Sequence, residues 1–412
     1  MIILNISNMP VWLWGKDRGI PSVFFPQKEF AGAGHDVRFL CPVKGDEPAY
    51  SFMEGVHIRR FDFPFNFRKK SYFQVYSFLQ RLRVTLLSNL NWLSFQISGF
   101  IQTAKLALKV RPDIIYAHSP ASVLPAYFVS VLFRAKLVVR IYGTRQLFWL
   151  WRNFFLRLKE FRDYLVFKIP AHYFIVTNDG SRGDLVAKKM GVRDEKIKYW
   201  RNGIDESFYE EVPGAKEDVC SFLNVKSSVK IIASTCRLNY EYGIDRVLNI
   251  LVELFKKQDD CIFVIAGSGP EEKRLKEFIK KNNISSRVFF LGILDRKTLK
   301  KILYAADLFL FLPRYYNCTN TVWEAMATGR CIVTTETELI KEVLTSEQDS
   351  ILVSEEGLND LPDILEKLLN NDSFREQLGN NARKRAKEIL EPWPVRIEKE
   401  AKLLEDLVAG SR

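Results

Sequence analysis

The stretch from Asp307 to Thr335 constrains the fold more than any other part of the chain. It reads DLFLFLPRYYNCTNTVWEAMATGRCIVTT: a short apolar run stops at Pro313, a polar turn and a helical segment follow, and a second apolar run comes after Gly329. Apolar runs of this length are typical of buried parallel strands, and glycine readily adopts the left-handed conformation that ends a helix. The order therefore predicts a strand, a loop, a helix and a second strand. Ligands of open α/β sheets lie outside the carboxyl ends of the strands, so the polar turn predicts a binding loop.

The same alternation recurs on both sides of an acidic, irregular stretch at residues 206–228, which predicts two α/β domains with doubly wound parallel sheets. A chain of 412 residues has room for two such domains. We place them at residues 1–205 and 206–388, and assign 389–412 to a C-terminal helix. The expected strands are MIILNIS, GHDVRFLCP, HIRRFDFP, DIIYAHSP, KLVVRIYGT and YFIVTND in the first domain, and KIIASTCRL, CIFVIAGSGP, RVFFLGIL, DLFLFLP and RCIVTT in the second.

The charge and the cysteine content of the chain bound its partners and its compartment. A net charge of +12 and a pI near 9.3 favour an anionic partner, such as a nucleoside diphosphate, an acidic membrane surface or a nucleic acid. The six cysteines are scattered without a C-x-x-C pair, and the chain has four histidines. This pattern indicates neither a disulfide framework nor a zinc site, and it favours a reducing compartment.

Three segments bear on contact with a membrane. The opening MIILNISNMP lacks a basic n-region and is expected to be a first strand. The uncharged stretch from Val84 to Ala104 contains enough Asn, Ser and Gln to predict an amphipathic or core helix. The basic and aromatic stretch from Arg134 to Lys168 could be a packed helix with a solvated basic face, or an interfacial helix on an anionic membrane. We therefore expect a cytoplasmic protein that could lie peripherally on the inner face of the cell membrane.

Glu324 has two interpretations on spacing alone. With Thr321 it forms a T-x-x-E pattern, which is typical of a capping box in which the carboxylate accepts a backbone N–H. The same carboxylate stands on the helix that follows the predicted binding loop, where it could contact a ligand instead. Spacing does not separate the capping role from the ligand role.

The segment WEAMATGRCIVTT, together with the loop that begins at Pro313, resembles the donor-site segment of the family-four glycosyltransferases. The segments IASTCRLNYEYGIDRVL, AHSP, RIYGT, VTNDGSRGDLV and WRNGID are similar to that family as well, so the resemblance covers nearly the whole chain. It implies a GT-B fold, in which two Rossmann-like domains face an interdomain cleft and the last helix packs back on the first domain. It also implies that Glu324 holds the ribose hydroxyls of a nucleotide sugar.

The resemblance assigns further residues to the donor. Arg237 occupies the position of an arginine that grips the donor diphosphate, and guanidinium matches phosphate bidentately at any working pH. Tyr242 stands where the family has a lysine, and His118 would reach the transferred sugar. His118, Arg237 and Glu324 are thus the expected catalytic residues. The other expected donor contacts are Gly15, Gly143, Thr144, Asn202, Thr235, Tyr242, Gly267, Gly292, Ile293, Leu294, Tyr316, Asn317, Cys318, Thr319 and Asn320.

The loop departs from the family at the position of an earlier glutamate. Counting back from Glu324 places that position at Tyr316, and counting forward from Pro313 places it at Asn317, because this loop is one residue shorter. An asparagine amide both donates and accepts hydrogen bonds. We therefore expect Asn317, helped by Asn320, to orient the sugar.

These observations predict a retaining glycosyltransferase that uses a UDP- or GDP-linked sugar and acts on a glycan or lipid-linked acceptor. Because the chain has no D-x-D pair, we assign no metal and no cofactor; Arg237 and backbone N–H groups at helix N-termini would balance the charge of the leaving group. The alternatives are a nucleotide-sugar epimerase of the same fold, a nucleotide-binding pseudoenzyme and a basic nucleic-acid-binding protein. The last has only the net charge in its favour, so no nucleic-acid partner is expected.

Overall fold

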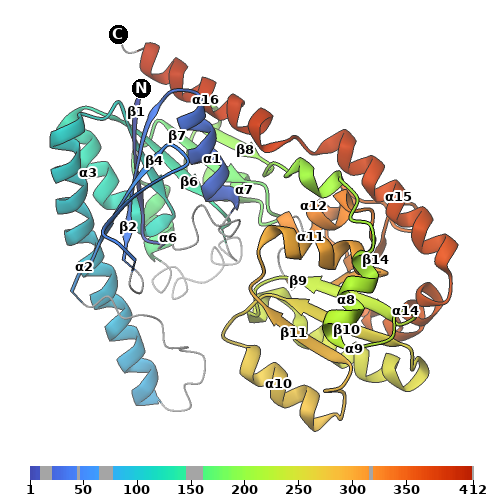
Figure 1. Cartoon of the computed structure of the whole chain (residues 1–412). Coiled ribbons are helices and arrows are strands. Elements are labelled where there is room, and N and C mark those ends of the chain that lie inside the picture. The colour runs from blue at the N-terminus through green and yellow to red at the C-terminus, as the bar shows by residue number, and fades with distance from the viewer. Residues whose placement is uncertain (10–20, 44–46, 65–77, 145–160, 315–318, 411–412) are drawn as a thin grey trace. The chain divides into compact units, whose positions relative to one another are not determined.

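The computed structural model describes residues 1–9, 21–43, 47–64, 78–144, 161–314 and 319–410 of the chain. The chain forms two compact units (Figure 1). Unit 1 contains residues 1–203 and 393–412, and unit 2 contains residues 204–392. Each unit is a largely parallel sheet with helices on both faces, which confirms the predicted α/β fold with two Rossmann-like domains.

Unit 1 is built on an eight-stranded sheet with the order β3-β4-β2-β1-β5-β6-β7-β8. All neighbouring strands are parallel except β3, which runs antiparallel to β4. The strands are β1 (Ile2–Ser7), β2 (Asp36–Pro42), β3 (Tyr50–Met53), β4 (Val56–Phe61), β5 (Ile114–His118), β6 (Lys136–Ile141), β7 (Tyr173–Thr177) and β8 (Ile197–Trp200). The central strands β1, β5 and β6 are almost wholly buried, as expected of strands that are covered on both faces.

Successive side chains along these strands enter two different cores, one on each face of the sheet. The helices of the unit are α1 (Pro21–Gly32), α2 (Phe78–Val110), α3 (Val123–Phe133), α6 (Phe161–Val166), α7 (Gly183–Lys189) and α16 (Trp393–Ala409). Ile3 and Tyr116 share one core with α1 and α16, whereas Leu4 and Ala117 share the other with α2, α3, α6 and α7. The C-terminal helix α16 thus supplies part of the core of unit 1.

Unit 2 is built on a six-stranded sheet with the order β11-β10-β9-β12-β13-β14, in which every neighbouring pair of strands is parallel. The strands are β9 (Lys230–Thr235), β10 (Cys261–Ala266), β11 (Val288–Gly292), β12 (Leu308–Phe311), β13 (Cys331–Thr335) and β14 (Ile351–Val353). The helices are α8 (Ala215–Leu223), α9 (Ile244–Lys257), α10 (Glu272–Lys281), α11 (Arg296–Ala305), α12 (Asn320–Ala327), α13 (Glu338–Lys341), α14 (Leu361–Leu369) and α15 (Asp372–Ile389).

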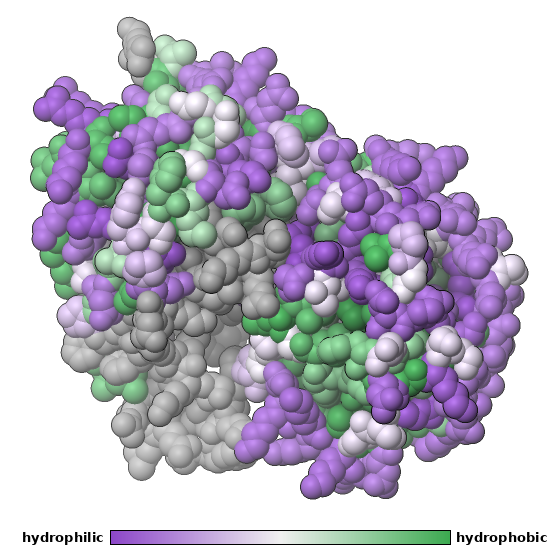
Figure 2. All heavy atoms as spheres, in the orientation of Figure 1, coloured by the Kyte–Doolittle hydropathy of each residue, from purple (hydrophilic) through white to green (hydrophobic). Residues whose placement is uncertain are grey.

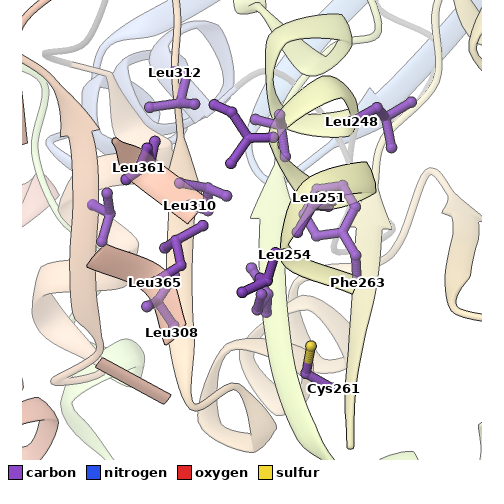
Figure 3. Close-up of a cluster of buried hydrophobic side chains, with 14 of the residues drawn as sticks. Leu248, Leu251, Leu254, Cys261, Phe263, Leu308, Leu310, Leu312, Leu361 and Leu365 are labelled. Atoms are coloured by element: carbon purple, nitrogen blue, oxygen red, sulfur yellow. The ribbon is translucent and has the colours of Figure 1, made fainter. Parts of the chain in front are cut away.

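Figure 3 shows the core on one face of this sheet. Leucines of α9 and α14 pack there against leucines of β12 and against Phe263 of β10. Helices α8, α11, α12 and α15 cover the other face. Burial on both faces accounts for the uninterrupted apolar run of β10, whose six residues are all buried.

The stretch at residues 206–228 is not irregular, as the sequence suggested. It contains α8, which begins after Gly214 and buries Ala215, Val219 and Cys220 against β9 and β10. The helix was not predicted from the sequence because it buries only three residues and the rest of the stretch is rich in acidic residues. Within the part of the chain that the structure describes, no helix combines the length and the apolar character needed to cross a bilayer.

Candidate functional site

Four loops meet at the carboxyl edge of the sheet in unit 2, and backbone hydrogen bonds tie them together. The loop after β9 is joined to the loop after β10 by the bond from Leu238 N to Ser268 O, of 3.1 Å. The loop after β10 is joined to the end of β11 by the bond from Gly267 N to Gly292 O, of 2.7 Å. The loop after β12 donates from Arg314 N to Glu241 O, at 2.9 Å. The edge is therefore a connected surface of backbone groups.

Two glycines allow these loops to approach one another. Gly243, with a φ of 69°, lies so close to β12 that a Cβ atom would overlap the carbonyl oxygen of Leu312. Gly267, with a φ of 147°, would likewise press a Cβ atom onto the carbonyl oxygen of Cys236. Glycine is needed at both positions because they combine a positive φ with contact between backbones.

Glu324 lies on α12 and is held by an arginine, not by the helix terminus. Its Oε1 accepts a hydrogen bond from Nη1 of Arg296 at 3.3 Å, and Nε of Arg296 donates to Asp205 at 2.9 Å. The capping-box interpretation is wrong: α12 begins at Asn320, so Thr321 lies inside the helix and its hydroxyl donates to the carbonyl oxygen of Thr235 at 2.7 Å. The carboxylate of Glu324 is thus free of a capping role.

The two carboxyl groups beside Arg296 have pKa values that are shifted in opposite directions. Glu324 is only 6% exposed, and burial raises the pKa of its carboxyl group, although the nearby Arg296 works in the opposite direction. Burial also acts against the charge of Asp205, but Arg296 and the hydrogen bonds from Ser207 outweigh it and hold the pKa of Asp205 below its ordinary value. One guanidinium therefore serves two carboxylates. Such a group favours ligands that donate hydrogen bonds, such as sugar hydroxyls.

Arg237 lies two residues after the end of β9 and is exposed. No side chain among the described residues forms an ion pair or a hydrogen bond with its guanidinium. Tyr242, at the position of the family's lysine, is half-buried and packs near the ring of Phe311, with the ring centroids 6.2 Å apart. Arg314 does not replace that lysine, because both of its Nη atoms bond the carboxylate of Asp245 at 2.8 Å. As far as the described residues show, the guanidinium of Arg237 is therefore available to a ligand at the predicted diphosphate position.

The end of β11 carries the residues that were expected to contact the nucleobase. Gly292 has a φ of 67°, and the side chain of Ile293 that follows it is exposed. Leu294 packs on the core beneath α8 and α11. Asp295 then caps α11 by accepting from Thr298 N at 2.8 Å. Contact of Gly292, Ile293 and Leu294 with a base stays a prediction.

Two of the predicted donor contacts are threonines with buried hydroxyls: Thr235 is the last residue of β9, and Thr319 directly precedes α12. The Oγ1 atoms of Thr235 and Thr319 have no hydrogen-bond partner among the described residues. Thr319 is the N-cap residue of α12, and Asn320 begins the helix. The expected contacts Tyr316, Asn317, Cys318 and Gly15 lie outside the described residues.

The predicted residues His118, Gly143, Thr144 and Asn202 belong to unit 1. His118 ends β5 and is 1% exposed. Its Nε2 lies 2.8 Å from Oδ1 of Asn5, whose own amide donates to Arg38 O, and its Nδ1 lies 2.6 Å from the hydroxyl of Tyr142. These partners favour the tautomer in which Nε2 carries the proton and Nδ1 accepts from Tyr142.

A buried charge network surrounds this histidine. Arg140 donates to Glu400 of α16 at 2.7 Å and lies over the ring of Tyr142 at 5.6 Å, and the hydroxyl of Tyr116 donates to Glu400 at 2.5 Å. Burial, together with the positive charge of Arg140, lowers the pKa of His118 to about 3. The imidazole is therefore neutral at physiological pH and acts as a hydrogen-bonding group, not as a cation. A sugar contact from His118 stays a prediction.

Gly143 and Thr144 adjoin an aspartate that the sequence analysis did not single out. Asp179 accepts from the backbone N of Ser181 at 3.0 Å and from its hydroxyl at 2.6 Å, and Thr144 N donates to the same hydroxyl at 3.1 Å. A Cβ atom at Gly143 would overlap Oδ2 of Asp179. Burial raises the pKa of Asp179 to about 6. Asn202 accepts from Arg140 at 3.5 Å.

Arg296, Asp205 and Asp179 are the charged residues that sequence reasoning missed. Arg296 and Asp179 each come within five residues of a strand's carboxyl end, a position shared with the predicted sites, and this was the available signal. The pairing of Arg296 with Asp205 joins residues 91 apart in the sequence, and no local pattern marks it.

Among the described residues, no group of three His, Cys, Asp or Glu side chains could hold a metal ion. Residues 145–160 of the basic and aromatic stretch lie outside the description.

Two family models match the chain. One, described as glycosyl transferases group 1, matches residues 217–385, and the other, described as glycosyltransferase family 4, matches residues 27–208. An uncharacterized glycosyltransferase of Methanocaldococcus jannaschii is 26% identical over 214 residues, which are 51% of this chain and 54% of that protein. A relative from Homo sapiens, one of the subunits of phosphatidylinositol N-acetylglucosaminyltransferase, is 29% identical over 181 residues, 44% of this chain and 35% of that protein.

These sequence matches span about half of the first relative and about a third of the second. A crystal structure of Anabaena HepE in complex with UDP-glucose has a TM-score of 0.72 to this chain and covers 99% of this chain and 100% of that chain, at 16% identity. At this identity the likeness concerns the fold.

Proposed function

Because this chain belongs to glycosyltransferase family 4 and has the GT-B fold, we propose that it transfers a sugar from a UDP- or GDP-linked donor to a glycan or lipid-linked acceptor. The donor is a substrate, and no cofactor is assigned. The crystal structure of the similarly folded HepE contains UDP-glucose, which favours a uridine donor for the first experiments.

The observation that carries the proposal is the state of Glu324. Glu324 is 6% exposed and accepts a hydrogen bond from Arg296 at 3.3 Å. Burial of a carboxylate costs folding free energy, so a buried glutamate at this position favours a functional role for the carboxylate. The capping role that would otherwise explain it does not apply, since Thr321 lies inside the helix and the N-cap residue Thr319 makes no capping bond. Ribose hydroxyls are the donors that this acceptor group suits.

The leaving group needs positive charge that the same edge of unit 2 can supply. Transfer forms a bond between the acceptor oxygen and the anomeric carbon of the sugar, and it breaks the bond from that carbon to the diphosphate, which departs with the electron pair. The acceptor proton passes to the departing phosphate oxygen. Arg237 would stabilise the developing charge, together with backbone N–H groups at the start of α12. With no further lysine at Tyr242, the diphosphate would depend heavily on Arg237. We propose retention of configuration, as the family resemblance implies.

The acceptor is assigned by class only. The human relative belongs by name to a phosphatidylinositol N-acetylglucosaminyltransferase, so a lipid-linked acceptor is a reasonable first choice beside soluble glycans. The epimerase, the pseudoenzyme and the nucleic-acid-binding protein are not favoured by the family matches. Two departures from the family keep the pseudoenzyme worth testing: the lysine that is replaced by Tyr242, and the earlier glutamate that is absent from the loop after Pro313.

Two measurements test the proposal. Calorimetric titration with UDP, GDP and ADP should show binding of one of the first two and weaker binding of ADP. Mass spectrometry after incubation with a panel of UDP- and GDP-sugars, in the presence of lipid extract or oligosaccharides, should show a product that is heavier by one sugar residue. Tight nucleotide binding without any product or donor hydrolysis would identify a pseudoenzyme, and interconversion of the donor sugar would identify an epimerase.

A further inference from the structure

The exposed large hydrophobic side chains of the described residues are concentrated on two helices of unit 1. More than half of them belong to α2 and α3, and their exposed fractions range from 42% to 68%. They are Leu86, Leu93, Ile97, Ile101 and Leu108 on α2, and Phe128, Val131 and Leu132 on α3. Large contiguous apolar patches are rare on monomers and mark sites of contact with a protein or a membrane.

The residues on α2 form one stripe along the helix. Leu93, Ile97 and Ile101 follow one another at intervals of four, which places them on the same side. The opposite side, with Phe95 and Leu106, is buried against the sheet of unit 1. The helix is therefore apolar on two faces, of which only one is needed for the core.

A groove between α2 and α3 joins their apolar surfaces. It has a volume of about 570 Å³ and is lined by Phe100, Tyr127, Phe128, Val131 and Leu132. The rings of Phe100 and Phe128 meet edge to face across it, with centroids 6.4 Å apart. The apolar surfaces of the two helices thus meet at this groove. The helices run along the left side of Figure 1, and on that side of Figure 2 hydrophobic surface alternates with hydrophilic surface.

The charges around this patch are mostly positive. Neither α2 nor α3 contains an acidic residue. Lys105 and Lys109 on α2, and Arg111 and Arg134 immediately after the two helices, are all exposed. Arg162 contributes a fifth positive charge, because its guanidinium lies 5.0 Å from the ring of Trp92 on α2. The acidic neighbour of Arg162, Asp163, is half-buried on α6.

We propose that the α2–α3 face docks on a bilayer that contains anionic lipids. Both helices would lie in the plane of the interface, with the apolar stripe and groove among the acyl chains and the basic residues at the headgroups. Lysine and arginine suit this place, because their aliphatic stems cover apolar surface while the charges reach the headgroups. A second copy of the chain is a poorer occupant, since pairing two such faces would set lysines and arginines against one another.

This inference deepens the proposed function and rests on it for its purpose, because a docked enzyme could reach a lipid-linked acceptor without extracting it from the bilayer. It differs from the interfacial helix expected within residues 134–168, since it places the contact on α2 and α3. The binding itself is measured without any sugar donor. Failure of the transferase proposal therefore leaves this inference intact, and the reverse also holds.

The test uses the whole protein and large vesicles of phosphatidylcholine with or without phosphatidylglycerol. We expect co-sedimentation with the anionic vesicles at low salt and partial release at high salt, because salt screens the basic residues but not the apolar contact. A triple variant with Ile97→Glu, Phe128→Glu and Val131→Glu should lower the partition coefficient at least about tenfold. The double variant Lys105→Glu with Lys109→Glu should weaken binding to anionic vesicles only.

Phe222→Glu is the matched control, because Phe222 is 75% exposed on α8 of unit 2 and is not part of the face. It should bind vesicles like the unchanged protein, and a melting curve should show that each variant is folded. Unchanged vesicle binding by the folded triple variant would overturn the proposal, as would loss of binding only on reversal of Arg152 and Arg157. A dimer in light scattering that the triple variant disrupts, without vesicle binding, would assign the face to a second copy.

Discussion

The carboxylate of Glu400 lies 2.7 Å from the guanidinium of Arg140, although 260 residues separate the two in the sequence. Arg140 is 1% exposed and Glu400 is fully buried. A second guanidinium, from Arg396 on the same helix as Glu400, donates to the same carboxylate at 3.0 Å. The two arginines outweigh the effect of burial and keep the pKa of Glu400 below its ordinary value. Helix α16 is therefore fixed to the centre of the sheet by charge as well as by apolar packing.

Replacing Glu400 by glutamine should destabilise unit 1 severely. It would leave the buried guanidinium groups of Arg140 and Arg396 without a counter-charge, and breaking a buried pair in this way costs about 3–5 kcal/mol. Glu253→Gln is the control, because its ion pair with Lys256 is exposed. Calorimetric melting should show a large loss for the first variant and a small change for the second. Equal melting temperatures would mean that the network adds little to stability.

Substitution of two glycines with nearly the same φ can distinguish the cost of a left-handed backbone from the cost of overlap between a Cβ atom and a neighbouring backbone. Gly243 and Gly214 have φ values of 69° and 70°, but only at Gly243 would a Cβ atom meet another backbone, whereas Gly214 has open space within 4 Å. Gly214→Ala should cost about 1 kcal/mol from the left-handed conformation, and Gly243→Ala about 1–3 kcal/mol more from overlap with Leu312. Only Gly243→Ala should also weaken nucleotide binding, because it shifts the loop that carries Arg237. Equal losses of stability would contradict the overlap.

Glu324→Gln should reduce the affinity for the nucleotide with little effect on melting temperature. Glutamine keeps the size of the side chain and removes the charged acceptor, and a hydrogen bond to a charged group contributes about 1.5–3 kcal/mol. Calorimetric titration with UDP or GDP measures the affinity. The control is Thr321→Ala, which removes only the bond to the carbonyl oxygen of Thr235. Greater damage to binding from the threonine variant would leave Glu324 as a structural residue.

Arg237→Ala should weaken binding of the nucleoside diphosphate by about 1.5–3 kcal/mol without unfolding unit 2. The nucleoside itself should bind nearly as before, because the arginine is assigned to the phosphates. Arg246→Ala is the control, since this arginine is already paired with Glu355 at 2.7 Å. Unchanged diphosphate affinity in a folded Arg237 variant would remove it from the site.

His118 should make stability depend on pH in a defined window. In the unfolded chain the imidazole gains a proton below its ordinary pKa of 6.5, whereas in the folded chain its pKa is about 3. The stability present above pH 6.5 is therefore lost as the pH falls toward 3, at no more than about 1.4 kcal/mol per pH unit. His118→Gln should flatten this part of the curve of melting temperature against pH. Parallel curves for the two proteins would show that the histidine titrates normally.

The strands that face two cores could be predicted from sequence, because a strand that is buried on both faces needs an uninterrupted apolar run such as that of β10. The edge strand β3 has only half-buried and exposed residues, and β14 is three residues long, so neither produces such a run. Helix α8 was missed for a different reason, because its exposed face is acidic.

The candidate site was less accessible to sequence reasoning than the fold. The T-x-x-E pattern at Thr321 was misleading because α12 begins at Asn320, whereas a capping box with Thr321 as its N-cap residue requires the helix to begin two residues later, at Val322. The partner of Glu324 could not be foreseen, since Arg296 comes from a different helix and is shared with Asp205. Resemblance to a family located the glutamate, but the contacts that hold it belong to the tertiary structure.

The return of the chain to unit 1 at Trp393 has a consequence for biosynthesis. Unit 2 is contiguous and can be completed on the ribosome while unit 1, though begun first, still lacks the helix that brings Trp393, Ile397 and Glu400 to its sheet. Unit 1 is thus synthesised first but completed last. Until α16 is made, the face of its sheet that α16 covers is partly exposed. Nascent chains stalled with residue 392 outside the exit tunnel should lose unit 1 to protease and retain unit 2, whereas chains stalled with residue 409 outside it should keep both.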